Sequence, residues 1–262
     1  MKILVCIKQV PGSNNVEVDE KTGVLKREGV ESKMNPYDLY AIETALWIKE
    51  LTSCSVDVVT MGPPQAETVV REAFMMGVDG GYLFSDRKFA GADVLATSYT
   101  LSQGIQSIGH FDLIICGRQT TDGDTAQVGP ALAEFLSIPH VTWVKSIKDV
   151  TADEIVVEQD LSDSVELAVL KYPCLITVEK DIRQPRLPSY KKKLETENRV
   201  IHILHFDDFI NKDENKYGLN GSPTQVERIF PPEVNSVRVI LEGKPEDLVE
   251  KVIDKLKEIK YI

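Results

Sequence analysis

The sequence predicts an α/β protein with a doubly wound, mostly parallel sheet, antiparallel additions and an extended C-terminal arm. Two observations predict this class. In the first two-thirds of the 262 residues, short apolar runs alternate with amphipathic segments of about 12–16 residues, the pattern of βαβ units. One apolar run, Phe111–Cys116 (FDLIIC), leads through the glycine-rich loop Gly117–Pro130 into a further amphipathic segment. Ligands of such sheets bind beyond the carboxyl ends of the strands, where the strand order reverses.

The chain begins with strand patterns and then turns helical. Lys2–Val10 (KILVCIKQV) predicts a strand, and Val16–Asp19 with Val24–Arg27 predicts a hairpin around the turn Thr22-Gly23. A helix starts at Asn35-Pro36, with asparagine as its cap and proline in its first turn. One apolar stripe runs along this helix at helical spacing: Tyr37, Tyr40, Ala41, Thr44, Ala45 and Ile48.

Two strand–helix pairs follow. Ser55–Met61 (SVDVVTM) predicts a strand, and Gln65–Met76 predicts a helix that Gly77 closes, as glycine commonly does at a helix C-terminus. The second pair is a short strand at Tyr82–Phe84 and a long helix at Asp93–Ile108, closed by Gly109. Three segments follow the carboxyl ends of predicted strands: Val10–Asn14, Met61–Pro64 and Gly117–Gln127. We expect them to converge on one crevice at the carboxyl edge of the sheet.

The loop Gly117–Pro130 (GRQTTDGDTAQVGP) precedes a helix predicted to begin near Ala126. Such a loop can turn backbone N–H groups inward, and a helix N-terminus favours negative charge, so the segment suits a phosphate. An ordinary, well-capped βα connection is the structural alternative. Asp122 and Asp124 would repel phosphate, and we expect them to cap the helix, to accept from a ribose or to brace the loop. Glycines and threonines supply close approach and hydroxyl donors: Gly117, Gly123, Gly129, Thr120, Thr121 and Thr125.

After Pro139 the pattern becomes antiparallel and then irregular. The predicted strands are Val141–Ser146, Glu154–Gln159, Val165–Lys171 and a buried one at Cys174–Glu179. Asp181–Lys193 (DIRQPRLPSYKKK) is irregular and basic, and Glu197–Ile262 combines a strand-like piece, a polar linker at 211–221 and a helix at Pro245–Ile259. Because this tail has little core of its own, we expect it to pack on a partner or to wrap the same domain. We therefore divide the chain into an α/β domain, residues 1–182, and a partner-docking arm, residues 183–262.

Composition excludes several function classes. The net charge of −11 argues against non-specific binding to nucleic acid or to an anionic membrane, and no apolar run reaches the ~18–20 residues of a membrane span. The four cysteines, at positions 6, 54, 116 and 174, are widely spaced without a CxxC motif, which favours reduced thiols and a cytoplasmic location. The histidines form no ligand pattern with them, so no metal site is expected.

Five separated motifs resemble the small (beta) subunit of electron-transfer flavoproteins, in the same order and over nearly the whole chain. They are VCIKQVPG (Val5–Gly12), MNPYDLYAIETAL (Met34–Leu46), VTMGPP (Val59–Pro64), GRQTTDGDTAQVGP (Gly117–Pro130) and GSPTQV (Gly221–Val226). The resemblance implies a flavodoxin- or Rossmann-like fold that binds an adenine nucleotide. It also implies a heterodimer with a larger alpha subunit, which carries another flavin and is embraced by the C-terminal arm.

The resemblance places an adenine-nucleotide pocket at the crevice that the pattern predicts. The loop Gly117–Val128 would wrap pyrophosphate and ribose, and Cys6 and Met61 would contact adenine through their backbone or simply place sulfur in the core. Asn35 would both bind the nucleotide and cap its helix, whereas either role is open for Asp38. The full set of implied site residues is Cys6, Asn35, Pro36, Tyr37, Asp38, Met61, Gly117, Arg118, Gln119, Thr120, Thr121, Asp122, Gly123, Asp124, Thr125, Ala126, Gln127 and Val128.

Two of these side chains have alternative interpretations. Tyr37 could stack near a flavin or belong to the core, and Arg118 could pair with a phosphate or lie in solvent. None of the side chains in the set is predicted to act as an acid, a base or a nucleophile.

Two branches of this family differ in the nucleotide. The conventional branch holds structural AMP, whereas the electron-bifurcating branch holds a complete FAD that exchanges hydride with NAD(H). The motifs at Asp122–Pro130 and Gly221–Val226 resemble the bifurcating branch more closely, and Gly123 and Ala126 leave room for a flavin ring. FAD is therefore favoured over AMP. The implied activity takes hydride from NADH, passes one electron to ferredoxin and the other through the alpha-subunit flavin to a partner dehydrogenase.

The segment Arg183–Lys193 corresponds to the loop by which the family docks on acyl-CoA dehydrogenases. It is several residues shorter than the resemblance would lead us to expect, so a flavin-dependent lactate dehydrogenase is an equally good partner. Its basic residues could dock an acidic surface or remain solvated.

Overall fold

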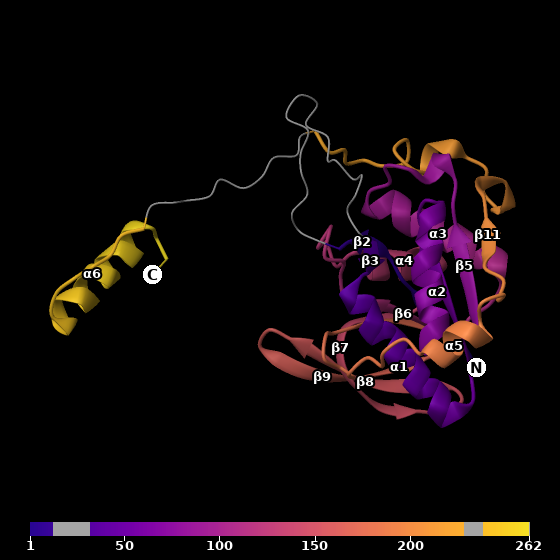
Figure 1. Ribbon diagram of the computed structural model, residues 1–262, viewed down its shortest axis with the longest axis horizontal. Helices are drawn as coiled ribbons and strands as arrows, with labels where there is room; N and C mark the ends of the chain where they lie inside the picture. Colours follow the sequence, from indigo (N-terminus) through magenta and orange to yellow (C-terminus); the bar gives the residue numbers. More distant parts are fainter. Residues whose placement is uncertain (13–31, 228–237, 262) are drawn as a thin grey trace.

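The computed structural model describes residues 1–12, 32–227 and 238–261, and these residues confirm the predicted α/β class. Within them, nine strands form one sheet in the spatial order β11-β5-β4-β1-β6-β10-β7-β8-β9 (Figure 1). The strands are β1 (Lys2–Cys6), β4 (Ser55–Met61), β5 (Gly80–Phe84), β6 (Leu113–Gly117), β7 (His140–Val150), β8 (Glu154–Leu161), β9 (Ser164–Lys171), β10 (Cys174–Val178) and β11 (His202–Leu204). Strand pairs from β11 to β7 are parallel, and β8 and β9 add the predicted antiparallel extension.

Helices cover both faces of the parallel part, which makes the sheet doubly wound. They are α1 (Pro36–Thr52) and α2 (Glu67–Met76) on one face, and α3 (Val94–Ile108) and α4 (Val128–Leu136) on the other. From β1 the chain proceeds outward to β4 and β5, and then returns to β6 on the opposite side of β1. The strand order therefore reverses between β1 and β6, where ligands of this architecture bind.

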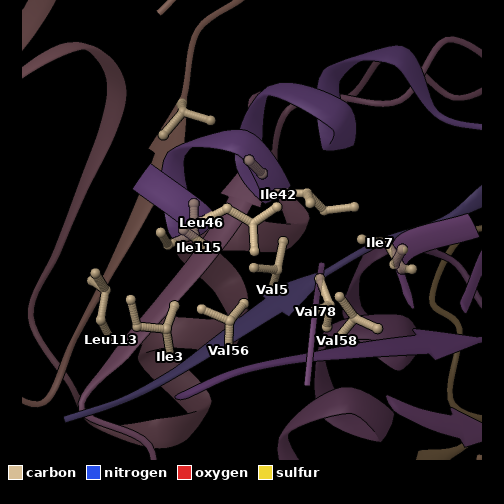
Figure 2. Close-up of a cluster of buried hydrophobic side chains, with 14 of the residues drawn as sticks. Ile3, Val5, Ile7, Ile42, Leu46, Val56, Val58, Val78, Leu113 and Ile115 are labelled. Atoms are coloured by element: carbon tan, nitrogen blue, oxygen red, sulfur yellow. The ribbon is translucent and has the colours of Figure 1, made fainter. Parts of the chain in front are cut away.

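Alternation along the strands builds two hydrophobic cores. Ile3 and Val5 of β1 point toward Ile42 and Leu46 of α1 in the core of the first face (Figure 2), whereas Leu4 faces the α3–α4 side. Each fully buried aliphatic side chain contributes roughly 1.5–3 kcal/mol. Near-continuous apolar strands such as Ile3–Val5 are typical of a parallel sheet that is buried on both faces.

The helix ends follow the predicted residues in most cases. Asp93 caps α3 by accepting from Ala96 N–H, and Gly77 and Gly109 close α2 and α3 with φ of 124° and 122°. The first turn of the predicted Gln65–Met76 helix is a 3₁₀ turn, η1 (Pro64–Ala66). A second such turn, η2 (Arg87–Phe89), precedes α3.

The predicted first strand is shorter than expected. β1 ends at Cys6, because Lys8 N–H donates to the Asp38 carboxylate at 2.7 Å and leaves the ladder. The following residues form β2 (Gln9–Pro11), which pairs antiparallel with β3 (Ser32–Met34) in a separate small sheet. The hairpin predicted at 16–27 lies outside the described residues.

Residues beyond 182 pack against the domain in part. The segment predicted to be irregular contains a short helix, α5 (Tyr190–Glu195), which Ser189 caps by accepting from Lys192 N–H. β11 extends the sheet beyond β5, and the turns η3 (Phe206–Asp208) and η4 (Glu214–Lys216) bring aromatic side chains into the α3–α4 core. The last helix, α6 (Pro245–Glu258), buries none of its side chains against the described residues.

In the described ranges, no helix is both long and apolar enough to cross a bilayer.

Candidate functional site

The carboxyl ends of β1, β4 and β6 bring three separated parts of the sequence together. Cys6 is in register with Cys116 on one side and with Val59 on the other, and Met61 ends β4. The N-terminus of α1 and the loop after β6 border this edge, since α1 packs against β6 and Asn35 bonds to the loop. Of the three segments from which the crevice was predicted, Met61–Pro64 and Gly117–Gln127 begin at this edge, whereas residues 13–14 of Val10–Asn14 lie outside the described residues.

The loop between β6 and α4 presents backbone N–H groups. α4 begins at Val128, and the side chain of its N-cap residue Gln127 makes no capping bond. Among the described residues, the N–H groups of Gln127, Val128 and Gly129 have no acceptor, as expected of an uncapped first helical turn. This helix start can therefore donate to an anion, and the helix dipole favours one there.

Two residues before the helix adopt positive φ. Asp124 has φ of 51° and Ala126 of 55°, and Gln127 returns to the right-handed region at −109°, −21°. A left-handed residue next to a right-handed one turns successive N–H groups toward the same side, which produces an anion-binding concavity. Backbone geometry and helix terminus therefore favour the same kind of ligand.

The acidic residues of the loop brace it and do not cap the helix. Asp122 accepts from Lys8 Nζ at 2.7 Å, and Asp124 accepts from Gln119 Nε2. Burial raises the pKa of Asp122, but the bonds to Lys8 more than offset it and leave the pKa below its ordinary value. Of the three roles expected for these carboxylates, bracing of the loop is observed and capping of α4 is not, because the N-cap position of α4 belongs to Gln127.

Asn35, just before α1, is hydrogen-bonded to the loop. Its Nδ2 donates to Gln119 O and to Asp38 Oδ1, both at 2.9 Å, and its Oδ1 accepts from Thr121 N–H at 3.2 Å. Asn35 occupies the N-cap position of α1, but its side chain makes no capping bond there. The predicted capping role is therefore wrong for this side chain, since the loop takes up its hydrogen-bonding groups.

Asp38 lies beneath the loop and is 4% exposed. Its Oδ2 accepts from Lys8 N–H at 2.7 Å and its Oδ1 accepts from Asn35. Burial raises the pKa of Asp38 to about 7, although the bonds to Asn35 and Lys8 act in the opposite direction. This carboxyl group therefore changes its ionisation near neutral pH.

Arg118, at the start of the loop, is bound to other side chains of the protein. Its Nη1 lies 2.6 Å from Glu179 Oε1, and its guanidinium lies over the Trp143 ring at 4.6 Å from the centroid. Trp143 has a positive φ of 56°, and its N–H donates to Thr177 Oγ1 at 3.0 Å. Glu179 and Trp143 were not predicted, because no local motif marks residues that meet only through the β6–β10–β7 register.

The remaining predicted residues surround this edge. Tyr37 and Pro36 are half-buried at the start of α1, and Cys6 and Met61 are half-buried at strand ends. Residues Thr121 to Thr125 are exposed at the loop tip, whereas Gln119, Thr120, Ala126 and Val128 are partly covered. Lys8 was not among the predicted site residues. Its position inside the motif VCIKQVPG (Val5–Gly12), two residues after Cys6, was a signal that could have included it. Taken together, amide donors, hydroxyls and small residues suit binding of an anion.

Comparison with known proteins gives a consistent family. Residues 22–201 match the model of the electron transfer flavoprotein domain. The chain is 44% identical over 257 residues to an electron transfer flavoprotein subunit beta of Thermoanaerobacterium thermosaccharolyticum, with 98% of each chain covered. It is also 44% identical to the caffeyl-CoA reductase-Etf complex subunit CarD of Acetobacterium woodii, and 40% identical to the acryloyl-CoA reductase electron transfer subunit gamma of Anaerotignum propionicum, again with 98% coverage of both chains.

Proposed function

The chain belongs to the electron transfer flavoprotein family as a beta subunit, and from this premise we propose that its own nucleotide site holds FAD. The observation that carries the proposal is the uncapped start of α4 behind a loop with positive φ at Asp124 and Ala126. Such a loop can hold a pyrophosphate through main-chain amides.

The described residues fit this group. Amides of Gln127 and Val128 would bind the pyrophosphate, and the strand ends at Cys6 and Met61 would border the adenine. Asp122 and Asp124 are tied to Lys8 and Gln119, which reduces their repulsion of phosphate. A bound flavin would supply hydride and single-electron transfer, while the chain binds and orients it and shapes its surroundings.

Space at the loop tip favours FAD over the alternative ligand, structural AMP. A Cβ built on Gly123 would meet only Thr120 Oγ1, at 3.5 Å, and the small Ala126 follows. The tip residues are exposed, so a ring system beyond the adenosine diphosphate part meets no bulky side chain from them. In the conventional alternative, AMP would fill the site and this subunit would carry no redox group.

We propose that the subunit acts in electron bifurcation between NADH, ferredoxin and a partner dehydrogenase, as one half of a heterodimer with an alpha subunit. Two relatives are named as parts of caffeyl-CoA and acryloyl-CoA reductase complexes, which supports a partner of the acyl-CoA type over a lactate dehydrogenase. A docking surface is available on residues 183–195, where Leu187 is 87% and Tyr190 71% exposed.

The flavin content of the purified heterodimer tests this proposal. The chain is co-expressed with its alpha subunit, the complex is denatured, and the released FAD and AMP are quantified by chromatography. The FAD assignment predicts two FAD and no AMP per heterodimer. One FAD with one AMP would refute it in favour of the conventional alternative. NADH oxidation that depends on ferredoxin in the presence of an acyl-CoA dehydrogenase then tests bifurcation.

A further inference from the structure

We propose that Asn35 and Asp38 are positioning residues that form an ionisation-controlled clasp on the loop 117–125, closed when Asp38 is charged and open when it is neutral. The clasp itself depends only on contacts within the chain. Its consequence, weaker nucleotide binding at lower pH, rests on the proposed function. Neither side chain is then needed as a direct ligand of the nucleotide.

The clasp joins three elements through one asparagine. The amide nitrogen of Asn35 donates one hydrogen to Asp38 Oδ1 and the other to Gln119 O, and its amide oxygen accepts from Thr121 N–H. Asp38 in turn receives Lys8 N–H, just after β1. Every hydrogen that points at Asp38 comes from a neutral donor, so the ionised, acceptor-only carboxylate is the form that these partners fit.

Protonation of Asp38 reverses this match. A neutral carboxyl group must donate its hydrogen, and both of its neighbours are donors. Rotation of the Asn35 amide by half a turn would present Oδ1 to the new hydroxyl. The same rotation would place Oδ1 against Gln119 O and Nδ2 against Thr121 N–H, so both bonds to the loop would be lost. One proton therefore decides the orientation of the amide, and the amide orientation decides whether the loop is held.

The charged and titratable groups that face Asp38 come from each neighbouring element. Lys8 after β1 favours the charged form and Asp122 of the loop opposes it, while the buried free thiol of Cys116 in β6 lies close. The Lys8 ammonium is bound to Asp122, so it does not pair with Asp38. By contrast, the other buried acid on α1, Glu43, is directly paired with Arg186. Burial without a paired cation brings the pKa of Asp38 to about 7, so the switch would operate near neutral pH.

Hydrogen exchange of the Thr121 amide tests the clasp in the full-length, ligand-free chain. Protection factors are measured at about pH 6 and about pH 8.5, on either side of the Asp38 pKa, so that intrinsic exchange rates cancel. Wild type is expected to protect Thr121 roughly ten-fold more at the higher pH, the size of one hydrogen bond to a buried group. Asp38→Asn should give low protection at both pH values. Equal protection of Thr121 in wild type at both pH values would overturn the clasp.

Lys8→Gln serves as the matched control variant. It removes the ammonium but keeps the backbone N–H that bonds to Asp38, so the pH dependence should persist with its midpoint moved upward. Loss of the pH dependence in Lys8→Gln would assign it to the Lys8–Asp122 ion pair and would contradict the role of Asp38. Circular dichroism of each variant shows that the fold is retained.

Binding of FAD and of AMP over the same pH range separates the clasp from the proposed function. Wild type should bind more weakly by about ten-fold at the lower pH, whereas Asp38→Asn should bind weakly and without pH dependence. An unchanged pH dependence of binding in Asp38→Asn would contradict the clasp. If neither nucleotide binds at any pH while Thr121 protection still switches, the proposed function fails and the clasp stands.

Discussion

At Gly117 the backbone of β6 passes so close to α1 that no side chain fits between them. A Cβ there would lie 2.5 Å from Asp38 Oδ1 and 2.7 Å from the Tyr37 carbonyl carbon. Gly117→Ala should therefore destabilise the chain by about 1–3 kcal/mol, the usual cost of overpacking, and displace Asp38. Gly123→Ala is the control, because its Cβ would meet only Thr120 Oγ1 at 3.5 Å. Urea unfolding measures both, and equal stability of the two variants would contradict the close approach.

Asp38 also predicts a pH dependence of global stability. Its pKa is about 7 in the folded chain against an ordinary 3.8, so the native state binds the proton more tightly than the unfolded state does. Its contribution to the free energy of unfolding therefore falls as pH rises from about 4 to about 8, by roughly 4 kcal/mol at 1.36 kcal/mol per pKa unit. Urea titrations at several pH values over this range should show the free energy of unfolding of wild type falling relative to that of Asp38→Asn as the pH rises. A constant difference would show that Asp38 does not titrate near neutrality.

These residues also mark the limit of sequence reasoning at this scale. The position of the loop was predictable, because a glycine-rich stretch between an apolar strand and an amphipathic helix has a local meaning. The partners of Asn35 and Arg118 were not, since Gln119, Thr121 and Glu179 reach them only after the sheet has formed. Side-chain roles therefore depended on contacts between distant segments, which no local pattern contains.

Among the elements, the segment after β10 is anchored to α1 through Arg186, chiefly at the Glu43 carboxylate and also by an ion pair with Glu50 at 2.9 Å. Arg186 donates to Glu43 through Nε and Nη2, both at 2.8 Å, and its own N–H donates to the same side chain at 3.0 Å. Glu43→Gln should cost about 1.5–3 kcal/mol, because it removes the charged acceptor of three hydrogen bonds and leaves Arg186 only the more exposed Glu50 as an ionic partner. It should also make residues 186–195 more sensitive to limited proteolysis.

An exposed ion pair on the same segment provides the comparison. Lys191 and Glu195 lie 3.8 Å apart on the surface of α5, so Glu195→Gln should change stability by less than about 0.5 kcal/mol. Similar losses in the two variants would show that Glu43 does not anchor the segment.

Element prediction succeeded where periodicity was long and failed where it was short. β4 was predicted at its observed bounds, and α1 and α3 began at their predicted caps or one residue later, because these runs carry clear apolar periods and end signals. β2, β3 and α5 were missed or merged with neighbours. Each is only a few residues long and depends on tertiary contacts, as with Lys8 N–H, which leaves the ladder for Asp38.

At the scale of the whole molecule, α6 is an amphipathic helix without a partner inside the described chain. Its apolar residues recur at helical spacing on one side: Leu248, Val249, Val252, Ile253 and Leu256, followed by Ile259 at the C-cap. Val252 and Ile253 remain 46% and 38% exposed, which is costly for a pair of aliphatic side chains in mid-helix. We propose that the alpha subunit covers this face of α6.

Charge substitution on this face tests that assignment. The double variant Val252→Asp with Ile253→Asp should leave the urea stability of the isolated chain within about 0.5 kcal/mol, since α6 buries none of its side chains against the described part of the chain. Binding to the alpha subunit should weaken by at least about 2 kcal/mol, as when two buried apolar anchors are lost from an interface. Lys251→Glu on the polar side controls for the added negative charge and should bind normally. Co-purification followed by calorimetric titration measures the binding of both variants to the alpha subunit. Normal binding of the double variant would place the alpha subunit elsewhere on this chain.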